Sequence, residues 1–314
     1  MITPRRELVL DAIKGGVLTL VLFLAYVTFP VIGLLPALFV PLPAVYVYFK
    51  NGAAAGAGVF AITLTVLMLM QDGSATLLYV LQSGLIGFLL PFFYLRGKGT
   101  AKSVAYAVGI AFLLIVALAV AYGFWAGVDL QGMLLKGIES STEQAIGIYS
   151  KQGLSPEDLA MLTSGIRQAG QLIASVFPAL LLVSLGMMAA LNMSVLFRFA
   201  AKSLPHLPQP ESFLLFRNPE ALVWILIAAG FSMLVPQPDL KRVALNILVV
   251  LGFIYFLQGL AVVLAFFRRV SVPSLARIIF WLVLAFQPYL VLAIAFLGVF
   301  DIWGDFRTPK QKNL

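Results

Sequence analysis

Residues 243–267 read VALNILVVLGFIYFLQGLAVVLAFF, a run of 25 residues without Asp, Glu, Lys or Arg. Its length and polarity match the roughly 20 apolar residues that a helix needs to cross the hydrocarbon core of a bilayer. The apolar residues follow one another instead of alternating with polar ones, which favours a helix over a strand of a membrane barrel. The run therefore predicts a membrane-spanning helix and sets the fold class.

The composition of the whole chain has the same character as this run. Apolar residues make up 61% of the 314 positions and charged residues 11%, whereas soluble domains average about half apolar and a quarter charged. The sequence contains no cysteine and one histidine, His206. These counts exclude disulfides, cysteine nucleophiles and metal clusters built on several histidines. We therefore expect an all-α membrane protein without a metal site or a bound cofactor.

Nine apolar segments predict a polytopic membrane helix bundle with about nine spans. The second segment is short and carries Pro36, Pro41 and Pro43, so we expect a broken helix there, or one that spans only part of the hydrocarbon core. The compact turn at residues 236–239 favours nine spans, and eight remain if residues 219–236 do not cross. The nine segments are residues 15–35, 36–49, 52–70, 75–94, 101–126, 169–197, 219–236, 243–267 and 278–300.

The basic residues lie in short clusters between the apolar segments, a pattern typical of membrane orientation and not of nucleic-acid binding. With the N-terminus in the cytoplasm and nine spans, thirteen of the 21 Lys and Arg residues lie on the cytoplasmic side. With eight spans the number is fifteen, so the positive-inside rule does not decide the side of the C-terminus.

Residues 127–168 are soluble in character, and we expect them on the external side of the membrane. Leu130, Leu134 and Ile138 recur at every fourth position, which indicates an amphipathic helix. Residues 155–158, Ser-Pro-Glu-Asp, are a strong helix start that leads into the sixth span. The segment is either a solvated connector or a lid over an outward-facing cavity. It is longer than the usual connection between helices, so the lid interpretation stays open beside the connector.

No Asp, Glu, Lys or Arg falls in the middle of a predicted span, and the acidic residues near the spans, among them Asp301, are assigned to turns or tails. This distribution argues against an intramembrane aspartyl protease and a proton-relay antiporter. His206 lies in a polar loop, which argues against a rhomboid-type serine protease. The sequence also lacks a G-x-x-x-x-G-K-[ST] phosphate loop. We therefore expect a protein that is not an enzyme and has no catalytic residues.

Neutral polar and aromatic side chains in the outer half of the spans are the candidate ligand contacts. Stacking and hydrogen bonds from such groups can hold a small amphipathic molecule. The same residue types also form interfacial aromatic belts and hydrogen bonds between helices. The second of these roles is the one we expect for Asn192, Asn246 and Gln258. The candidate contacts are Tyr26, Thr28, Tyr79, Gln82, Ser83, Tyr122, Trp125, Gln171 and Ser175.

Small residues cluster in the third and fourth spans, where they allow two helices to approach closely. Two interpretations are open: close packing inside the fold, or a docking face for another membrane subunit. The residues are Gly52, Gly56, Gly58, Ala61, Gly84 and Gly87.

The first half combines a basic N-terminus, one long span, the proline-broken residues 36–43, a glycine- and alanine-rich helix from residue 51, and Gly-Leu-Ile-Gly at residues 84–87. This order resembles the S components of energy-coupling-factor vitamin importers, over about residues 10–200. The resemblance implies a six-helix core that binds a micronutrient near the outer surface and docks on a membrane coupling subunit driven by ATPases. Two features depart from it. About three C-terminal spans are extra, and the nearest match to an alanine-x-x-x-alanine coupling face is Ala12 with Gly16.

Three stretches of the C-terminal half carry a more specific resemblance. They are Asn246 within its apolar run, residues 255–262 (YFLQGLAV) and residues 297–307 (LGVFDIWGDFR). On these stretches the whole chain resembles the YybS-like family of bacterial membrane proteins, a family of unknown function. The resemblance implies a multi-pass protein of the bacterial cytoplasmic (inner) membrane, and we place its N-terminus in the cytoplasm.

Two functional hypotheses follow from the sequence. We divide the chain into an S-component-like core at residues 1–200, which includes the external segment, and C-terminal membrane helices with a short tail at residues 201–314. The first hypothesis is a binding subunit for a micronutrient-like small molecule in a transporter energised by a separate ATPase. The alternative is a non-catalytic scaffold or envelope-assembly protein that binds other membrane proteins. The expected partners are the lipid bilayer, a small-molecule ligand and a coupling subunit with its ATPases, but not nucleic acid.

Overall fold

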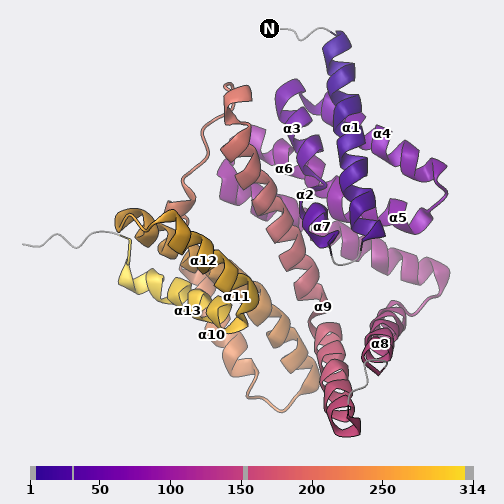
Figure 1. The fold of residues 1–314 in the computed structure, drawn as a ribbon, viewed down its shortest axis with the longest axis vertical. Helices are drawn as coiled ribbons and strands as arrows, with labels where there is room; N and C mark the ends of the chain where they lie inside the picture. Colours follow the sequence, from indigo (N-terminus) through magenta and orange to yellow (C-terminus); the bar gives the residue numbers. More distant parts are fainter. Residues whose placement is uncertain (1–4, 30–31, 151–154, 308–314) are drawn as a thin grey trace, which may run out of the picture. The chain divides into compact units, whose positions relative to one another are not determined.

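A computed structural model describes residues 5–29, 32–150 and 155–307, and in these ranges all regular secondary structure is helical (Figure 1). The expected all-α fold is confirmed. A π-helical stretch, η1 (Tyr79–Gly84), joins α5 to α6, and short 3-10 helices lie at η3 (Ala201–Ser203) and η4 (Phe213–Leu215). The α-helices are α1 (Arg5–Thr28), α2 (Leu34–Phe39), α3 (Leu42–Asn51), α4 (Ala53–Leu69), α5 (Gly73–Leu78), α6 (Leu85–Leu95), α7 (Gly99–Ala126), α8 (Leu130–Tyr149), α9 (Pro156–Phe199), α10 (Ala221–Ser232), α11 (Pro238–Arg269), α12 (Ser274–Phe286) and α13 (Pro288–Gly304).

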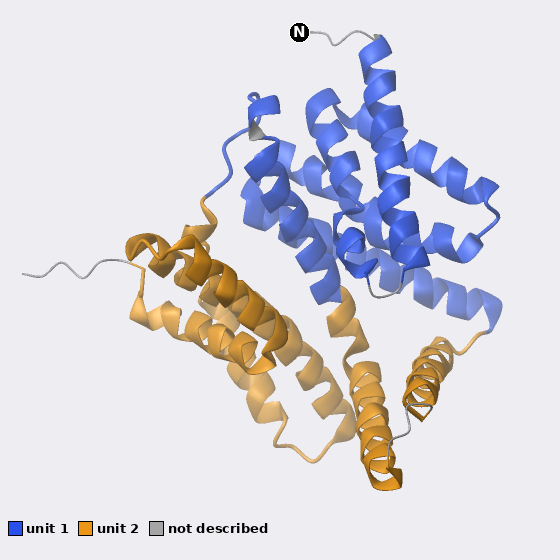
Figure 2. Ribbon diagram, viewed as in Figure 1, with its two compact units in different colours: residues 1–127, 182–211 blue, residues 128–181, 212–314 orange. Residues whose placement is uncertain are grey.

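The chain forms two compact units, coloured separately in Figure 2. Unit 1 comprises Met1–Gly127 and Leu182–Glu211, and unit 2 comprises Val128–Leu181 and Ser212–Leu314. Unit 1 therefore contains α1 to α7 and the C-terminal part of α9, whereas unit 2 contains α8, the N-terminal part of α9 and α10 to α13. The functional division at residue 200 stays a prediction.

Within the described ranges, six helical stretches are long and apolar enough to cross a membrane, and a seventh is added if the bent pair α12–α13 counts as one span. Helix α4 has 17 residues and α10 has 12. At about 1.5 Å per residue α10 reaches about 18 Å, against a hydrocarbon core of about 30 Å. The protein is polytopic and helical as expected, but it has fewer full-length spans than the nine apolar segments suggested. The six stretches are Arg6–Thr28, Leu34–Asn51, Gly73–Leu95, Gly99–Ala126, Pro156–Phe199 and Pro238–Arg269.

Proline explains two breaks in the helices. Helix α2 ends at Phe39 and α3 begins at Leu42, on either side of Pro41, so the broken second segment is confirmed. Helices α12 and α13 meet at an angle of 107°. Gln287 between them has an extended backbone, with φ −117° and ψ 95°, because Pro288 disfavours the helical conformation in the residue before it.

Both helices expected within residues 127–168 are present. Helix α8 covers the predicted amphipathic segment, and α9 begins directly after Ser155. The Asp158 N–H donates to Ser155 Oγ at 3.2 Å, and the Ser155 hydroxyl donates to Asp158 Oδ2 at 2.6 Å. From this cap α9 runs for 44 residues into the predicted sixth span. Arg167 of α9 bonds Glu143 of α8 at 3.1 Å, which joins the two helices within unit 2.

Helix α5 begins after an aspartate cap. The Asp72 carboxylate accepts hydrogen bonds from the Ala75 N–H at 2.9 Å and from the Ser74 hydroxyl at 2.7 Å. Both bonds favour the ionised carboxylate, so they lower the pKa of Asp72. The cap is therefore fully present above the ordinary pKa range of aspartate and is lost as the pH falls through the lowered pKa.

Candidate functional site

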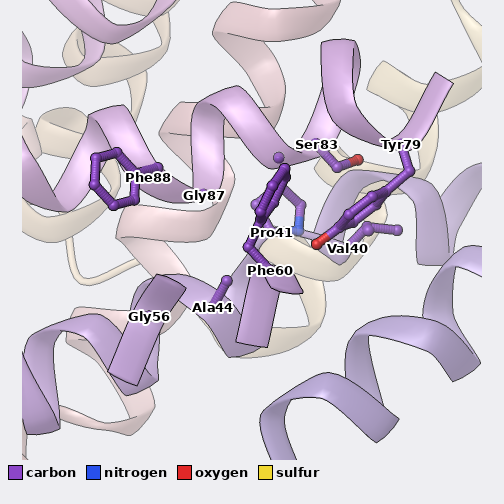
Figure 3. Close-up of a pocket in the computed structure, with 10 residues that line it drawn as sticks. Val40, Pro41, Ala44, Gly56, Phe60, Tyr79, Ser83, Gly87 and Phe88 are labelled. Atoms are coloured by element: carbon purple, nitrogen blue, oxygen red, sulfur yellow. The ribbon is translucent and has the colours of Figure 1, made fainter. Parts of the chain in front are cut away.

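The predicted contacts Tyr79 and Ser83 lie beside a small internal cavity of unit 1 (Figure 3). Their exposed fractions are 2% and 4%. The cavity has a volume of about 10 Å³, which is room for about one water molecule. Phe60 stacks on Tyr79 with ring centroids 5.7 Å apart, and Phe23 packs edge-on at 5.6 Å. Protein rings therefore pack against Tyr79, and the cavity beside Tyr79 and Ser83 leaves little space.

Three more predicted contacts belong to unit 1 near the same helices. Tyr26 packs edge-on against Phe23, with ring centroids 6.2 Å apart, and so joins the aromatic cluster around Tyr79. Gln82 is half-buried on η1, and Thr28 is exposed at the end of α1. The structure thus brings Tyr26, Tyr79 and Ser83 into one packed region, and a ligand-binding role for them stays a prediction.

The remaining predicted contacts lie on α7 and α9. Tyr122 and Trp125 of α7 are 51% and 87% exposed, as residues of an interfacial aromatic belt are. Gln171 and Ser175 lie on the part of α9 that belongs to unit 2, and the Ser175 hydroxyl donates to the Gln171 carbonyl at 2.9 Å. That bond lies within one helix, so it does not place Ser175 toward a ligand.

Four of the small residues pack against neighbouring groups inside unit 1. A methyl group added at Gly56 would lie 2.8 Å from the Tyr48 side chain. Gly52 has a positive φ of 89° at the turn between α3 and α4, and Ala61 is exposed. These contacts support the packing interpretation, and a partner-docking role stays a prediction. The four contacts are Gly56 on Tyr48, Gly58 on Ala12, Gly84 on Phe60 and Gly87 on Ala44.

The two small residues nearest to an importer coupling face also pack inside unit 1. A methyl group at Gly16 would lie 2.8 Å from Ile62 of α4, and Ala12 is 7% exposed. Both positions of α1 therefore face α4.

A larger groove lies in unit 1 among α1, α3 and the end of α9. Its volume of about 370 Å³ falls in the range of about 300–1,000 Å³ that is usual for small-ligand sites. None of its lining residues was among the predicted contacts, because its apolar lining residues resemble lipid-facing ones and its charged residues lie at the ends of spans. Its walls are mostly apolar and include Leu18, Leu22, Leu42, Val47, Leu196 and Phe199.

One end of this groove is charged. Lys50 Nζ bonds Asp11 Oδ2 at 2.7 Å, and Asn51 Nδ2 donates to the same oxygen at 2.7 Å. Lys14, one helical turn after Asp11, also lines the groove and is exposed. Among the residues that line this end, two ammonium groups oppose one carboxylate, which favours an acidic group on a ligand.

Asn192 and His206 satisfy backbone groups at helix ends of unit 1. Asn192 Nδ2 donates to the Leu38 carbonyl of α2 at 2.7 Å, so its expected hydrogen bond between helices is confirmed. His206 Nε2 lies 2.8 Å from the Phe49 carbonyl near the end of α3. Carbonyls in the last turn of a helix lack donors within the helix. Both side chains therefore have a structural role.

In unit 2, Asn246 bonds the backbone of α9 beside Pro178. Its Oδ1 accepts the Ala179 N–H at 3.0 Å, and its Nδ2 donates to the Ser175 carbonyl at 2.8 Å. These two backbone groups are the pair that would bond each other in a straight helix. The expected hydrogen bond between helices is confirmed, and its position explains how α9 tolerates a proline.

Replacing Asn246 with leucine should lower the free energy of unfolding by about 1–3 kcal/mol, because backbone groups of α9 lose their partner. The loss should be smaller when Pro178 is also replaced by alanine. Helix α9 can then straighten, and the Ala179 N–H can donate to the Ser175 carbonyl. Detergent-micelle unfolding of the four proteins checks this. Equal losses in both backgrounds would contradict the explanation.

A buried carboxylate in unit 2 corrects one expectation. Asp301 lies within α13 and is 0% exposed, so its assignment to a turn or tail is wrong. Its Oδ2 accepts hydrogen bonds from Gln258 Nε2 at 3.0 Å and Arg307 Nη2 at 2.6 Å, and Arg217 Nε lies 4.0 Å away. Arg217 also pairs with Asp305. We call these five residues the Asp301 cluster.

Gln258 joins the cluster to the segment before α10. While its Nε2 bonds Asp301, its Oε1 accepts the Asn218 N–H at 3.0 Å, and Asn218 Nδ2 donates to the Ile254 carbonyl at 3.1 Å. Gln258 is 0% exposed. Its expected role in hydrogen bonding between helices is confirmed, and it connects three segments at once.

Two glycines bring α11 and α13 together beside the cluster. A methyl group at Gly298 would lie 2.7 Å from the Gly259 nitrogen, and one at Gly259 would lie 2.8 Å from the Ile294 carbonyl carbon. The backbones of α11 and α13 are therefore in direct contact where the two helices cross. The stretches 255–262 and 297–307 meet here, and each pairs a glycine with a polar residue within one helical turn. That pairing is the signal by which the cluster could have been found.

Comparison with known proteins finds similarity along most of the chain. The chain is similar to a protein named "Uncharacterized protein YybS" of Bacillus subtilis (strain 168), with 22% identity over 316 residues that cover 96% of this chain and 98% of the relative. No solved structure matches the chain. Residues 17–302 match a family described as "Predicted membrane protein (DUF2232)". Because the match covers most of its length, this integral membrane protein belongs to the DUF2232 family.

Proposed function

We propose that the protein is a non-catalytic binding subunit that holds a small amphipathic molecule with an acidic head in the groove of unit 1. The observation that carries the proposal is the groove itself, about 370 Å³ in volume, with apolar walls and Asp11, Lys14 and Lys50 at one end. Apolar walls accept a hydrocarbon chain. The net positive end accepts an acidic group.

The groove is a different place from the ligand site that the sequence predicts in the outer half of the membrane, and that site stays a prediction. Tyr79 and Ser83 adjoin about 10 Å³ of space, which is too little for a metabolite. If the N-terminus lies in the cytoplasm of a bacterial cell, Asp11 and Lys14 near the start of α1 place the charged end of the groove on the cytoplasmic side of the membrane.

We also propose that any movement of the ligand is energised by a separate ATPase with its membrane coupling subunit. The sequence offers no phosphate loop for the chain to hydrolyse ATP by that mechanism. Because Ala12 and Gly16 pack on α4, a coupling subunit has to dock on another surface of unit 1.

A second candidate is a scaffold that binds other membrane proteins, and one face of α4 favours it. Ala54, Ala57 and Ala61 are exposed at spacings of three and four residues, which allows close approach of another helix. The chain has no cysteine, so Ala57→Cys gives a single crosslinking site. Crosslinks to division or wall-synthesis proteins favour the scaffold, whereas crosslinks to an ATPase-linked subunit favour transport.

Replacing Leu18 with tryptophan should fill the groove and weaken ligand binding at least about tenfold, which corresponds to about 1.4 kcal/mol. Binding is measured in nanodiscs with parinarate, a fluorescent fatty acid. Decanoate should compete with it, and decyltrimethylammonium should compete poorly because its head is cationic. Val17→Trp is the matched control. Val17 is 53% and Leu18 51% exposed, but only Leu18 lines the groove.

Two outcomes would contradict the proposal. One is an equal effect of Leu18→Trp and Val17→Trp, which would mean that the probe partitions into the bilayer around the protein. The other is an unchanged preference for decanoate over decyltrimethylammonium after Lys14→Gln. Lys14 supplies the uncompensated charge at the end of the groove, so its loss should reduce this preference.

A further inference from the structure

Three arginines flank the turn between α11 and α12 in unit 2. Arg268 and Arg269 occupy the last turn of α11, and Arg277 lies in the first turn of α12. All three are exposed, and none takes part in an ion pair among the residues that the structure describes. The turn therefore carries three uncompensated positive charges.

The position of the Arg277 side chain and the start of α12 also favour an anion at this turn. Arg277 Nε donates to the Val272 carbonyl at 2.9 Å, which holds the guanidinium beside the turn and leaves its two Nη groups for another acceptor. Helix α12 begins after Pro273, which provides no side-chain cap for its first N–H groups. Uncapped N–H groups at a helix start carry partial positive charge and suit a phosphate oxygen.

Helix α12 adds an apolar surface that continues from this basic turn. Its 13 residues reach about 20 Å, less than the thickness of the hydrocarbon core. Because a short apolar helix with basic residues at one end is most stable with that end at the headgroups, the arginines lie where phosphates are found. Five of its exposed apolar side chains are Leu275, Ile278, Ile279, Leu282 and Phe286.

We propose that the turn between α11 and α12 binds the phosphodiester headgroup of an anionic phospholipid, with the acyl chains along α12. The occupant is a bilayer lipid, because the apolar surface of α12 begins at the same residues that supply the charge. This site lies in unit 2 and does not depend on the groove proposed in unit 1.

Trp281 of α12, which is 43% exposed, provides a local reporter. In a variant with Trp125, Trp224 and Trp303 replaced by phenylalanine, its fluorescence is measured in vesicles that contain brominated phosphatidylglycerol or brominated phosphatidylcholine at equal fractions. We expect preferential quenching by the anionic lipid, and the preference should fall with added salt. Each arginine should contribute about a fivefold preference for phosphatidylglycerol over phosphatidylcholine.

The triple variant Arg268→Gln, Arg269→Gln and Arg277→Gln should remove the preference. A control with three exposed lysines replaced by glutamine should keep it. Equal quenching by both lipids in the unsubstituted background would overturn the proposal, as would a preference that survives the triple variant. If inorganic phosphate abolishes the preference at matched ionic strength, the turn is a free-anion site and the lipid proposal fails. Single substitutions supply the same test should the triple variant not fold. The control lysines are Lys98, Lys102 and Lys136.

Discussion

Replacing Gly259 with alanine is expected to lower the free energy of unfolding by about 3 kcal/mol, the upper part of the usual range for overpacking. The added methyl group would lie 2.8 Å from the Ile294 carbonyl carbon and 3.0 Å from the Gly298 nitrogen. Both are backbone atoms, so no side-chain rotation relieves the collision. Helices α11 and α13 have to separate, and the bond from Gln258 to Asp301 lengthens with them.

Gly252 on the same helix is the matched control for this change. It has no atom within 4 Å of an added methyl group, so Gly252→Ala should raise stability by up to about 1 kcal/mol through better helix propensity. The two substitutions are chemically identical and should have opposite signs. Unfolding by sodium dodecyl sulfate in mixed micelles measures both. If Gly259→Ala changed the stability no differently from Gly252→Ala, α11 and α13 would not be in contact at Gly259.

The helices themselves could be predicted because long uncharged runs leave few other structures in a bilayer. The length of an apolar run does not show whether a proline bends the helix within it. Residues 278–300 were counted as one span, although Pro288 forces Gln287 out of the helical conformation and splits the run into α12 and α13. Residues 219–236 include turn residues that hydropathy alone does not separate from the 12-residue helix α10.

Contacts between helices were easier to predict from the polar residues within runs than ligand contacts, which stay predictions. Asn192 and Gln258 were expected to find partners because an unpaired amide is costly away from water; both groups of the Gln258 amide are bonded, as is the amide nitrogen of Asn192. A ligand site depends in addition on empty volume. Whether Tyr79 meets a ligand or another ring depends on where Phe60 lies, and Phe60 reaches it only through tertiary packing.

Asp301 could not be placed from local sequence because its burial depends on a distant helix. Residues 301–307, Asp-Ile-Trp-Gly-Asp-Phe-Arg, resemble the start of a polar tail. Gly298, one turn earlier, lets α11 approach closely enough to cover the Asp301 carboxylate, and its partner Gln258 lies 43 positions away in the sequence.

Replacing Asp301 with asparagine should cost about 3–5 kcal/mol, the usual effect of removing one partner of a buried ion pair. The change keeps the size of the side chain but leaves the guanidinium of Arg307 without a counterion. Side-chain exposure is 0% for Asp301 and 8% for Arg307, so water cannot replace the lost charge. Unfolding in mixed micelles gives the size of the loss.

Asp305→Asn is the control, because Asp305 pairs with Arg217 at the surface and both side chains are 48% exposed. Exposed pairs contribute about 1 kcal/mol or less, so this variant should remain close to the original stability. The two aspartates lie four residues apart, and the comparison isolates the effect of burial.

A double-mutant cycle with Arg307→Gln separates the ion pair from the other contacts of Asp301. If Asp301 and Arg307 stabilise unit 2 through each other, the second substitution should cost less once the first is present, with a coupling of about 1–3 kcal/mol. Additive losses would instead mean that Asp301 acts through Gln258 and that Arg307 acts through its bond to the Leu214 carbonyl. A stable Asp301→Asn variant would contradict a stabilising role for the negative charge of Asp301, since asparagine can still accept the Gln258 hydrogen bond.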